Sequence, residues 1–292
     1  MSGTARRNRK WYRIPVTADV PPHNSGMSEQ LGPRPSDRHV QSFARGLQVI
    51  RSFDAAHGAL TLSEVAARTG LTRAGARRIL LTLQGLGYVQ ADGRHFRLTP
   101  RILELGFAYL SSQPLWHLAE PVMQRLAETV HESCSMAVLD GPEIVYLLRV
   151  PARRIMSINL GVGSRLPAYC TSMGRVLLGG LGEQERQATL AGALRGQTTL
   201  PARTPATLVG LPEVMRAIDQ AREQGWCLVV DELEQGLTSL AAPIEDRNGR
   251  VAAALNISTH SAASRESLLA QALPALRVAA REISDLLSRT GH

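Results

Sequence analysis

Two short amphipathic segments separated by a glycine turn constrain the fold of this chain more than any other feature. The first follows Thr61, which can cap a helix together with Glu64 three residues later, and it ends at Gly70. Thr72 can then cap a second helix that runs to about Leu86. Two short helices joined by a turn of three or four residues that contains glycine predict a helix-turn-helix.

The segments on either side extend this motif to a winged helix. An apolar pattern from Val40 predicts a preceding helix that stops near residues 57–58 and buries one side, which includes Phe43. After the motif, two strand-like segments flank an Asp92-Gly93 turn and predict a β-hairpin, the wing. We therefore expect a winged helix-turn-helix domain at residues 37–99.

The second helix of the motif separates its residues by chemistry. At 100° per residue, apolar side chains between Ala76 and Leu86 recur on one side of the helix. The opposite side carries small and positively charged side chains. Arginine reads guanine in the major groove, and alanine can contact a thymine methyl group. The predicted DNA-binding residues are Thr72, Arg73, Ala74, Arg77, Arg78 and, in the wing, Arg94. Taken alone, the pattern also fits the solvated face of a small helical domain.

The positive charge is concentrated in the first third of the chain. Residues 1–101 contain 16 basic and 6 acidic residues, a net charge of +10, whereas residues 102–292 contain 17 and 19, a net charge of −2. Lys10 is the only lysine, so arginine, which pairs bidentately with phosphate and guanine, carries almost all of this charge. Codon bias would explain arginine in place of lysine but not the segregation. The N-terminal part is therefore expected to bind double-stranded DNA.

Other features of the sequence limit the classes of protein to which this chain can belong. Residues 1–36 mix basic residues with proline and glycine and predict a disordered basic arm, although Met27 begins an equally plausible chain. No stretch approaches the roughly 18 apolar residues of a membrane span. The three cysteines are far apart, without disulfide or zinc spacing, so we expect a reducing, cytoplasmic compartment and neither metal nor cofactor.

A further helix is predicted after the wing. Thr99-Pro100 opens it, and it runs from Arg101 to about Ser111 with more apolar surface than a free linker would tolerate. We expect this linker, residues 100–114, to pack against a second copy of the chain. The result would be a homodimer, or a dimer of dimers.

Residues 115–292 predict an α+β domain with an antiparallel sheet. Strand-like segments gather at both ends of this region and helical segments lie between them. The predicted strands are 134–139, 143–150, 155–160, 226–230, 240–244 and 251–258, and the predicted helices are 115–130, 172–180, 184–191, 212–224 and 265–287.

Five stretches resemble the IclR family of bacterial transcription regulators, and the resemblance covers nearly the whole chain from Val40. They are QSFARGL at 41–47, LTLSEVA at 60–66, LTPR at 98–101, LPAYCTSMGR at 166–175 and GLTSLAAP at 236–243. The first and fourth are most similar to the subgroup that controls protocatechuate, 4-hydroxybenzoate and β-ketoadipate pathway genes. The resemblance implies a GAF-like or profilin-like effector-binding domain and, as effector, a small organic acid that is aromatic or ring-derived.

The start of one predicted helix is the first candidate for the effector site. Thr171, Ser172 and Met173 open this helix, where backbone N–H groups and the helix dipole favour a carboxylate. In the family the corresponding helix start helps to hold an organic acid. Each residue could instead be a helix cap or a buried, hydrogen-bonded polar group.

Other effector-site candidates follow from the resemblance. Ser239, Asn256 and Ser258 match family positions that line the same pocket, and alternation places Asn256 and Ser258 on one strand face. Asp231 and Glu232 are further candidates, because the family often has an acid one position earlier, where this chain has valine. Arg149 and Arg165 could also pair with a ligand carboxylate, but the expected role of both is a surface or inter-strand salt bridge.

Two other classes of function remain open at this point. An enzyme acting on a small organic acid would need a catalytic motif, and no nucleophile elbow, phosphate-binding loop or zinc-protease motif occurs, so no catalytic residue is assigned. Cys170, just before a helix start, is the one candidate nucleophile. A DNA-binding architectural protein without a ligand is the other alternative. The sequence does not decide between a repressor and an activator.

Overall fold

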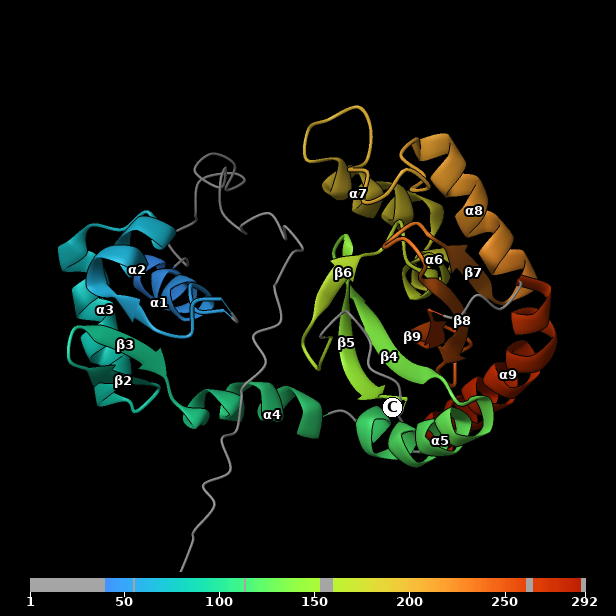
Figure 1. The fold of residues 1–292 in the computed structure, drawn as a ribbon, viewed down its shortest axis with the longest axis horizontal. Helices are drawn as coiled ribbons and strands as arrows, with labels where there is room; N and C mark the ends of the chain where they lie inside the picture. The colour runs from blue at the N-terminus through green and yellow to red at the C-terminus, as the bar shows by residue number, and fades with distance from the viewer. Residues whose placement is uncertain (1–39, 55, 113, 153–159, 261–264, 290–292) are drawn as a thin grey trace, which may run out of the picture. The chain divides into compact units, whose positions relative to one another are not determined.

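The computed structural model describes residues 40–54, 56–112, 114–152, 160–260 and 265–289; the arm predicted at residues 1–36 lies outside them. The chain divides into two compact units, Met1–Leu105 and Gly106–His292, and the boundary falls within the predicted linker (Figure 1). Among the described residues, no helix is long and apolar enough to cross a membrane.

The first unit contains the predicted winged helix-turn-helix. Its helices are α1 (Gln41–Arg51), α2 (Leu62–Thr69) and α3 (Arg73–Gly85), and its antiparallel sheet has the order β1-β3-β2, with β1 at Leu60–Thr61, β2 at Val89–Asp92 and β3 at His95–Leu98. The side chains of Val49, Val65, Ala76 and Leu80 are fully buried in one core, which the three helices share with the strands. The amphipathic pattern of α3 therefore packs as expected.

Three details of this unit differ from the sequence prediction. The strand β1 was not predicted, because two residues are too short to show an alternating pattern. The first helix ends at Arg51 rather than near His57, since the Asp54 carboxylate accepts hydrogen bonds from the N–H groups of Ala56 and His57 and forms a turn there. Phe43 is not buried: it is 68% exposed.

A segment with helical structure links the wing to the second unit. It begins with the 3-10 turn η1 (Pro100–Ile102), which Thr99 caps, and continues as α4 (Leu103–Ser111). Four large apolar side chains on α4 are about half exposed or more, namely Leu103, Leu105, Phe107 and Tyr109. The prediction of an unusually apolar linker helix is confirmed.

The second unit is built on one antiparallel sheet of the order β6-β5-β4-β9-β8-β7. The strands are β4 (Ser133–Asp140), β5 (Glu143–Val150), β6 (Arg165–Pro167), β7 (Cys227–Val230), β8 (Thr238–Glu245) and β9 (Val251–Thr259). The α+β class with an antiparallel sheet is confirmed. The strand predicted at 155–160 falls almost entirely outside the described residues, and the short edge strand β6 was not predicted.

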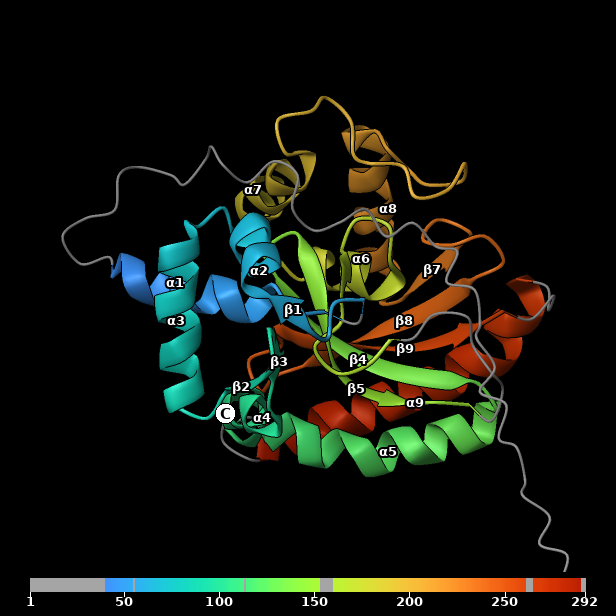
Figure 2. The ribbon, with the colours of Figure 1, turned by 60° about the vertical axis from the view of Figure 1, so that its left-hand side comes forward.

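Helices cover both faces of this sheet. They are α5 (Pro114–Val130), α6 (Ser172–Gly179), α7 (Glu183–Leu194), α8 (Leu211–Gln224) and α9 (Arg265–Arg289). Helices α5 and α9 lie side by side along one face, and α6 lies on the other, with α7 and α8 farther out (Figure 2). Because strand side chains alternate, Met136 and Leu255 pack toward α5 and α9, whereas Ala137 and Ala254 pack toward α6.

Candidate functional site

The glycine turn between α2 and α3 is held as the sequence predicts. The Thr61 side chain accepts a hydrogen bond from Glu64 N, and the Glu64 carboxylate accepts one from Thr61 N at 2.7 Å, which completes the capping box. Gly70 ends α2 with a φ of 66°, a left-handed conformation that glycine adopts without a steric penalty. Thr72 then caps α3 through a 3.1 Å bond from Gly75 N. The start of α3 is therefore fixed by local hydrogen bonds.

The predicted DNA-contacting face of α3 is open. Thr72, Arg73, Ala74, Arg77 and Arg78 are all exposed. In the part of the chain that the structure describes, the three arginines form no ion pair with an acidic side chain. An exposed row of arginines without internal partners leaves every guanidinium available to an external anion.

The wing presents further positive charge. Arg94 lies in the turn between β2 and β3, after Gly93, whose φ is 59°. Arg94 and Arg97 are both exposed. The wing is joined to the end of α3, because the Thr99 hydroxyl donates to the Gly87 carbonyl oxygen at 2.6 Å.

The second unit contains a pocket between the start of α6 and the sheet. It encloses about 480 Å³ of space without protein atoms, part of it open to solvent. Its lining residues are Tyr146, Arg149, Leu160, Cys170, Thr171, Ser172, Met173, Val229, Leu233, Leu237, Ser239, Asn256 and Ser258. Six of the eight predicted effector-site residues are thus brought together here.

Four of these residues form a hydrogen-bonded cluster. The hydroxyl oxygens of Ser172 and Ser239 lie 2.7 Å apart, and the Asn256 Nδ2 group donates to the hydroxyl oxygens of Ser239 and Ser258, each at 2.8 Å. The sheet register brings the three strand residues of this cluster together. Ser239 lies opposite Ser258, and Asn256 precedes Ser258 by two residues on the same face of the sheet. Small polar side chains therefore line the sheet side of the pocket.

The start of α6 is held close to the chain that precedes it. Thr171 is its N-cap: its hydroxyl accepts from Gly174 N at 3.2 Å and donates to the Pro167 carbonyl oxygen at 3.0 Å. A Cβ atom at Gly174 would overlap the backbone of Ala168, so only glycine fits there. Ser172 and Met173 follow the cap, and the first N–H groups of a helix have no partner within the helix. The helix start therefore presents N–H groups at the pocket.

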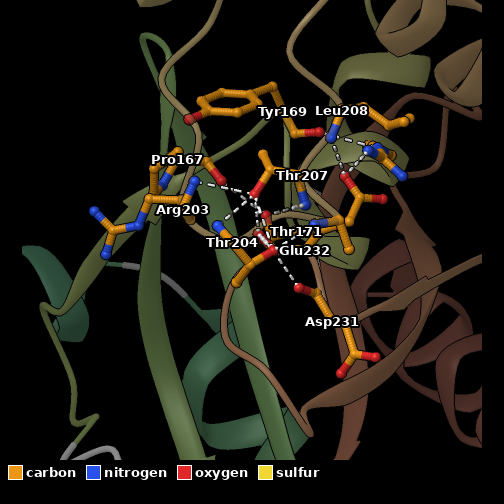
Figure 3. Close-up of polar contacts among 12 residues, drawn as sticks. Pro167, Tyr169, Thr171, Arg203, Thr204, Thr207, Leu208, Asp231 and Glu232 are labelled. Carbon is orange, nitrogen blue, oxygen red and sulfur yellow. Dashed lines mark hydrogen bonds and ion pairs between the residues drawn. The ribbon is translucent and has the colours of Figure 1, made fainter.

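Asp231 and Glu232 do not line this pocket. Asp231, with a φ of 60°, accepts a 2.6 Å hydrogen bond from Gly236 N in the loop before β8. Glu232 is buried, and its carboxylate binds Arg175 at 2.6 Å and Leu208 N at 3.1 Å. Figure 3 shows Glu232 within a network that also includes the hydroxyls of Thr204 and Thr207. These two acids hold loops in place.

The two arginines that were expected to form salt bridges lie in different surroundings. Arg165 forms the predicted salt bridges, with Asp140 and Glu143, each at 2.7 Å. Arg149, by contrast, lines the pocket. Tyr146, which no motif in the sequence indicated, and Arg149 both face the pocket because Leu147 is an extra residue, a β-bulge, in the pairing of β4 with β5.

The chemistry of the pocket does not favour a nucleophile or a metal. Burial raises the pKa of the Cys170 thiol to about 12, so the nucleophilic thiolate is scarce at neutral pH. Over the described residues, no group of three histidine, cysteine or acidic side chains is arranged to hold a metal ion. The site is suited to hydrogen bonding of a small molecule.

Two family models match the chain. The IclR helix-turn-helix domain matches residues 42–93, and the model described as the bacterial transcriptional regulator IclR C-terminal matches residues 107–285. The Pca regulon regulatory protein of Pseudomonas putida is 45% identical over 246 residues, which cover 84% of this chain and 83% of that protein.

Solved structures are similar over the same range. A transcriptional regulator from Rhodococcus sp. RHA1 is 49% identical with a TM-score of 0.76, and the match covers 86% of this chain and all of that one. An IclR homolog from Microbacterium hydrocarbonoxydans, in complex with 4-hydroxybenzoate, is 27% identical with a TM-score of 0.73, covering 84% and 98%. Since both parts of the chain match the family's models, this chain belongs to the IclR family of bacterial transcriptional regulators.

Proposed function

We propose that this IclR-type regulator controls genes for the breakdown of aromatic acids and that an aromatic or ring-derived carboxylate is its effector. The observation that carries the proposal is the pocket at the start of α6, whose lining includes Thr171, Ser172, Met173, Ser239, Asn256 and Ser258. Helix N–H groups and small polar side chains suit a carboxylate-bearing ligand. The similarity to a Pca regulon regulator and to a homolog that binds 4-hydroxybenzoate supports this class of ligand.

We assign operator recognition to the winged helix-turn-helix domain at residues 37–99, within the first unit. The proposed contacts place Thr72, Arg73, Ala74, Arg77 and Arg78 in the major groove and Arg94 on the phosphate backbone. Support comes from the exposure of this face and from the absence of ion pairs for its arginines among the described residues. Base contacts specify a sequence, whereas phosphate contacts position the protein on any DNA.

We also propose that the chain acts as a homodimer or a dimer of dimers, through the linker at residues 100–114. The exposed apolar side chains of α4, which include Leu103 (71% exposed) and Phe107 (66%), suit a self-contact. Ligand binding at residues 115–292 would then favour one arrangement of the DNA-binding units. A charge introduced at Phe107 should lower the oligomeric state measured by sedimentation.

If the chain were instead an enzyme that acts on a small organic acid, its incubation with the acid would yield a product. A regulator binds its ligand saturably and releases it unchanged, whereas an enzyme turns it over. The raised pKa of the Cys170 thiol disfavours a thiolate nucleophile, and no acid–base pair occurs among the residues that line the pocket.

The test is fluorescence anisotropy with DNA from upstream of the gene and of its divergent neighbour, at fixed salt. Protocatechuate, 4-hydroxybenzoate and β-ketoadipate are added in turn. We expect saturable, sequence-specific binding that one acid shifts. DNA binding that no acid changes would contradict the effector proposal, and the absence of specific binding to either fragment would contradict operator recognition there.

A further inference from the structure

Two parts of the pocket wall lie in segments outside the sheet. One is the start of α6, and the other is the β7–β8 loop (residues 231–237), which contributes Leu233 and Leu237. The β7–β8 loop is closed at its base. Asp231 N donates to the Leu237 carbonyl oxygen at 2.9 Å, and the Asp231 carboxylate accepts from Gly236 N at 2.6 Å. These bonds fix the form of the loop but not its distance from α6.

The α7–α8 loop (residues 195–210) forms hydrogen bonds with the β7–β8 loop. The Thr204 hydroxyl donates to the Asp231 carbonyl oxygen at 2.5 Å, and the Thr207 hydroxyl donates to the Glu232 carbonyl oxygen at 2.6 Å (Figure 3). Neither threonine is among the described residues that line the pocket. Both hydroxyls therefore hold a part of the pocket wall without lining the pocket themselves.

The same two hydroxyls organise the α7–α8 loop. The Thr207 hydroxyl oxygen accepts from Arg203 N at 3.0 Å and from Thr204 N at 2.9 Å, and the Thr204 hydroxyl oxygen accepts from Ala206 N at 3.1 Å. Each hydroxyl thus accepts within its own loop and donates to the β7–β8 loop, which uses both of its hydrogen-bonding roles. Thr207 is buried, so the loss of its hydroxyl would leave several groups unpaired.

The α7–α8 loop also contacts the start of α6. The Tyr169 hydroxyl donates to the Pro201 carbonyl oxygen, and Tyr169 directly precedes the residues of the helix start that line the pocket. Leu208 N donates to the Glu232 carboxylate, which pairs with Arg175 on α6. One loop is therefore bonded to both parts of the wall, and these bonds set the separation of the two parts.

We propose, on the basis of the effector function proposed above, that Thr204 and Thr207 are positioning residues for the pocket. Their hydroxyls hold the β7–β8 loop at the distance from α6 that suits a ligand, and they do so without contacting the ligand. A site that is formed for only part of the time binds with an affinity reduced by that fraction. The loss of either hydroxyl should therefore weaken ligand binding although the lining residues are unchanged.

Calorimetric titration of the full chain with 4-hydroxybenzoate, protocatechuate and β-ketoadipate in turn tests the proposal. Thr207→Val replaces the hydroxyl by a methyl group, and we expect it to weaken the binding of the preferred acid about tenfold. Thr207→Ser keeps the hydroxyl and should bind within about threefold of the unaltered protein. The matched control is Thr189→Val on α7, where the hydroxyl donates to the Glu185 carbonyl oxygen within the helix, and it should leave the affinity unchanged.

Two further measurements separate positioning from a general loss of stability. Ile283→Val leaves a small cavity in the core beneath α9, on the other face of the sheet, and should lower the melting temperature without changing the affinity for the acid. In the free Thr207→Val protein, hydrogen–deuterium exchange should be faster at residues 231–237 and unchanged in β9. Saturation with the acid should slow this exchange again, because the ligand favours the formed pocket.

The outcomes separate this inference from the proposed function. If Thr207→Val bound the acid as tightly as the unaltered protein, or if Ile283→Val weakened binding equally, the inference would be overturned while the pocket remained an effector site. Should Thr207→Val not fold, Thr204→Val, which removes the bond to Asp231, undergoes the same titration with the same expectation. If the unaltered protein bound its operator but none of the acids, both the inference and the effector proposal would be wrong.

Discussion

Arg175 on α6 and Glu232 in the segment after β7 form a buried ion pair, with the Nη2 and Oε2 atoms 2.6 Å apart. Arg175 Nε also donates to the Tyr169 carbonyl oxygen at 2.9 Å, and the Glu232 carboxylate accepts from Leu208 N at 3.1 Å. The pair therefore connects α6, whose start lines the pocket, to the chain segments that contain Glu232 and Leu208.

Removal of one partner of this pair should destabilise the second unit strongly. Glu232→Ala leaves the Arg175 guanidinium buried without its counter-ion, which costs about 3–5 kcal/mol. Urea unfolding followed by circular dichroism measures the change in the free energy of unfolding. The control is Glu213→Ala, which removes an exposed pair with Arg216 at 3.5 Å and should cost less than about 1 kcal/mol. Equal losses for the two variants would contradict the structural role of the buried pair.

Gly174 should be intolerant of even one added methyl group. A Cβ atom there would overlap the Ala168 backbone, so Gly174→Ala must shift the start of α6 and should cost about 1–3 kcal/mol. In Gly192→Ala, on α7, the added Cβ meets nothing within 4 Å, and the unfolded chain loses entropy. That control should gain about 0.5–1 kcal/mol. Thermal unfolding of the two variants gives the comparison, and a stabilised Gly174→Ala would show that the close approach is wrong.

The native protein should resist thiol reagents. Cys134, Cys170 and Cys227 are buried, and burial raises their pKa values to about 12, 12 and 11. Ellman's reagent at pH 8 should therefore react slowly with the folded chain and rapidly with all three thiols in denaturant. Fast reaction of one native thiol, mapped by mass spectrometry to Cys170, would revive the nucleophile hypothesis.

Local signals in the sequence were sufficient to predict the helix-turn-helix of the first unit. The capping residues Thr61 and Thr72 and the terminating Gly70 fix the helix boundaries through bonds within a few residues, so their positions can be read without a tertiary structure. The predicted burial of Phe43 was wrong, because helical spacing shows which side of a helix is apolar but not which part of the protein covers that side. Exposure of an apolar residue depends on contacts that the local pattern does not contain.

The pocket was predictable only in part. Alternation places Asn256 and Ser258 on one face, and the cap at Thr171 marks the helix start. Arg149 could not be placed, because simple alternation from the Asp140-Glu143 turn would set it opposite Cys134, on the face toward α5. The extra residue Leu147 reverses this direction, and nothing in the local sequence marks the bulge.

The DNA-binding proposal predicts that two exposed arginines differ in their effects. Arg77→Ala should lower affinity for the operator by about 1–3 kcal/mol and affect scrambled DNA much less, because it removes a contact to a base edge. Arg94→Ala should weaken both DNAs alike and reduce the slope of log affinity against log salt by about one, because it removes a phosphate contact. Anisotropy titrations of both DNAs over a range of salt concentrations measure the two quantities.

Arg250→Ala is the matched control for these variants. Arg250 is also exposed, but it lies in the second unit and pairs with Asp246 at 3.1 Å, so its loss lowers the net charge equally without touching the proposed interface. If affinity followed net charge alone, all three variants would weaken binding to the same extent. Specificity would then not come from α3, and its arginine face would be an ordinary solvated surface. A loss of discrimination confined to Arg77→Ala would instead locate sequence reading on that helix, since the three variants carry the same charge.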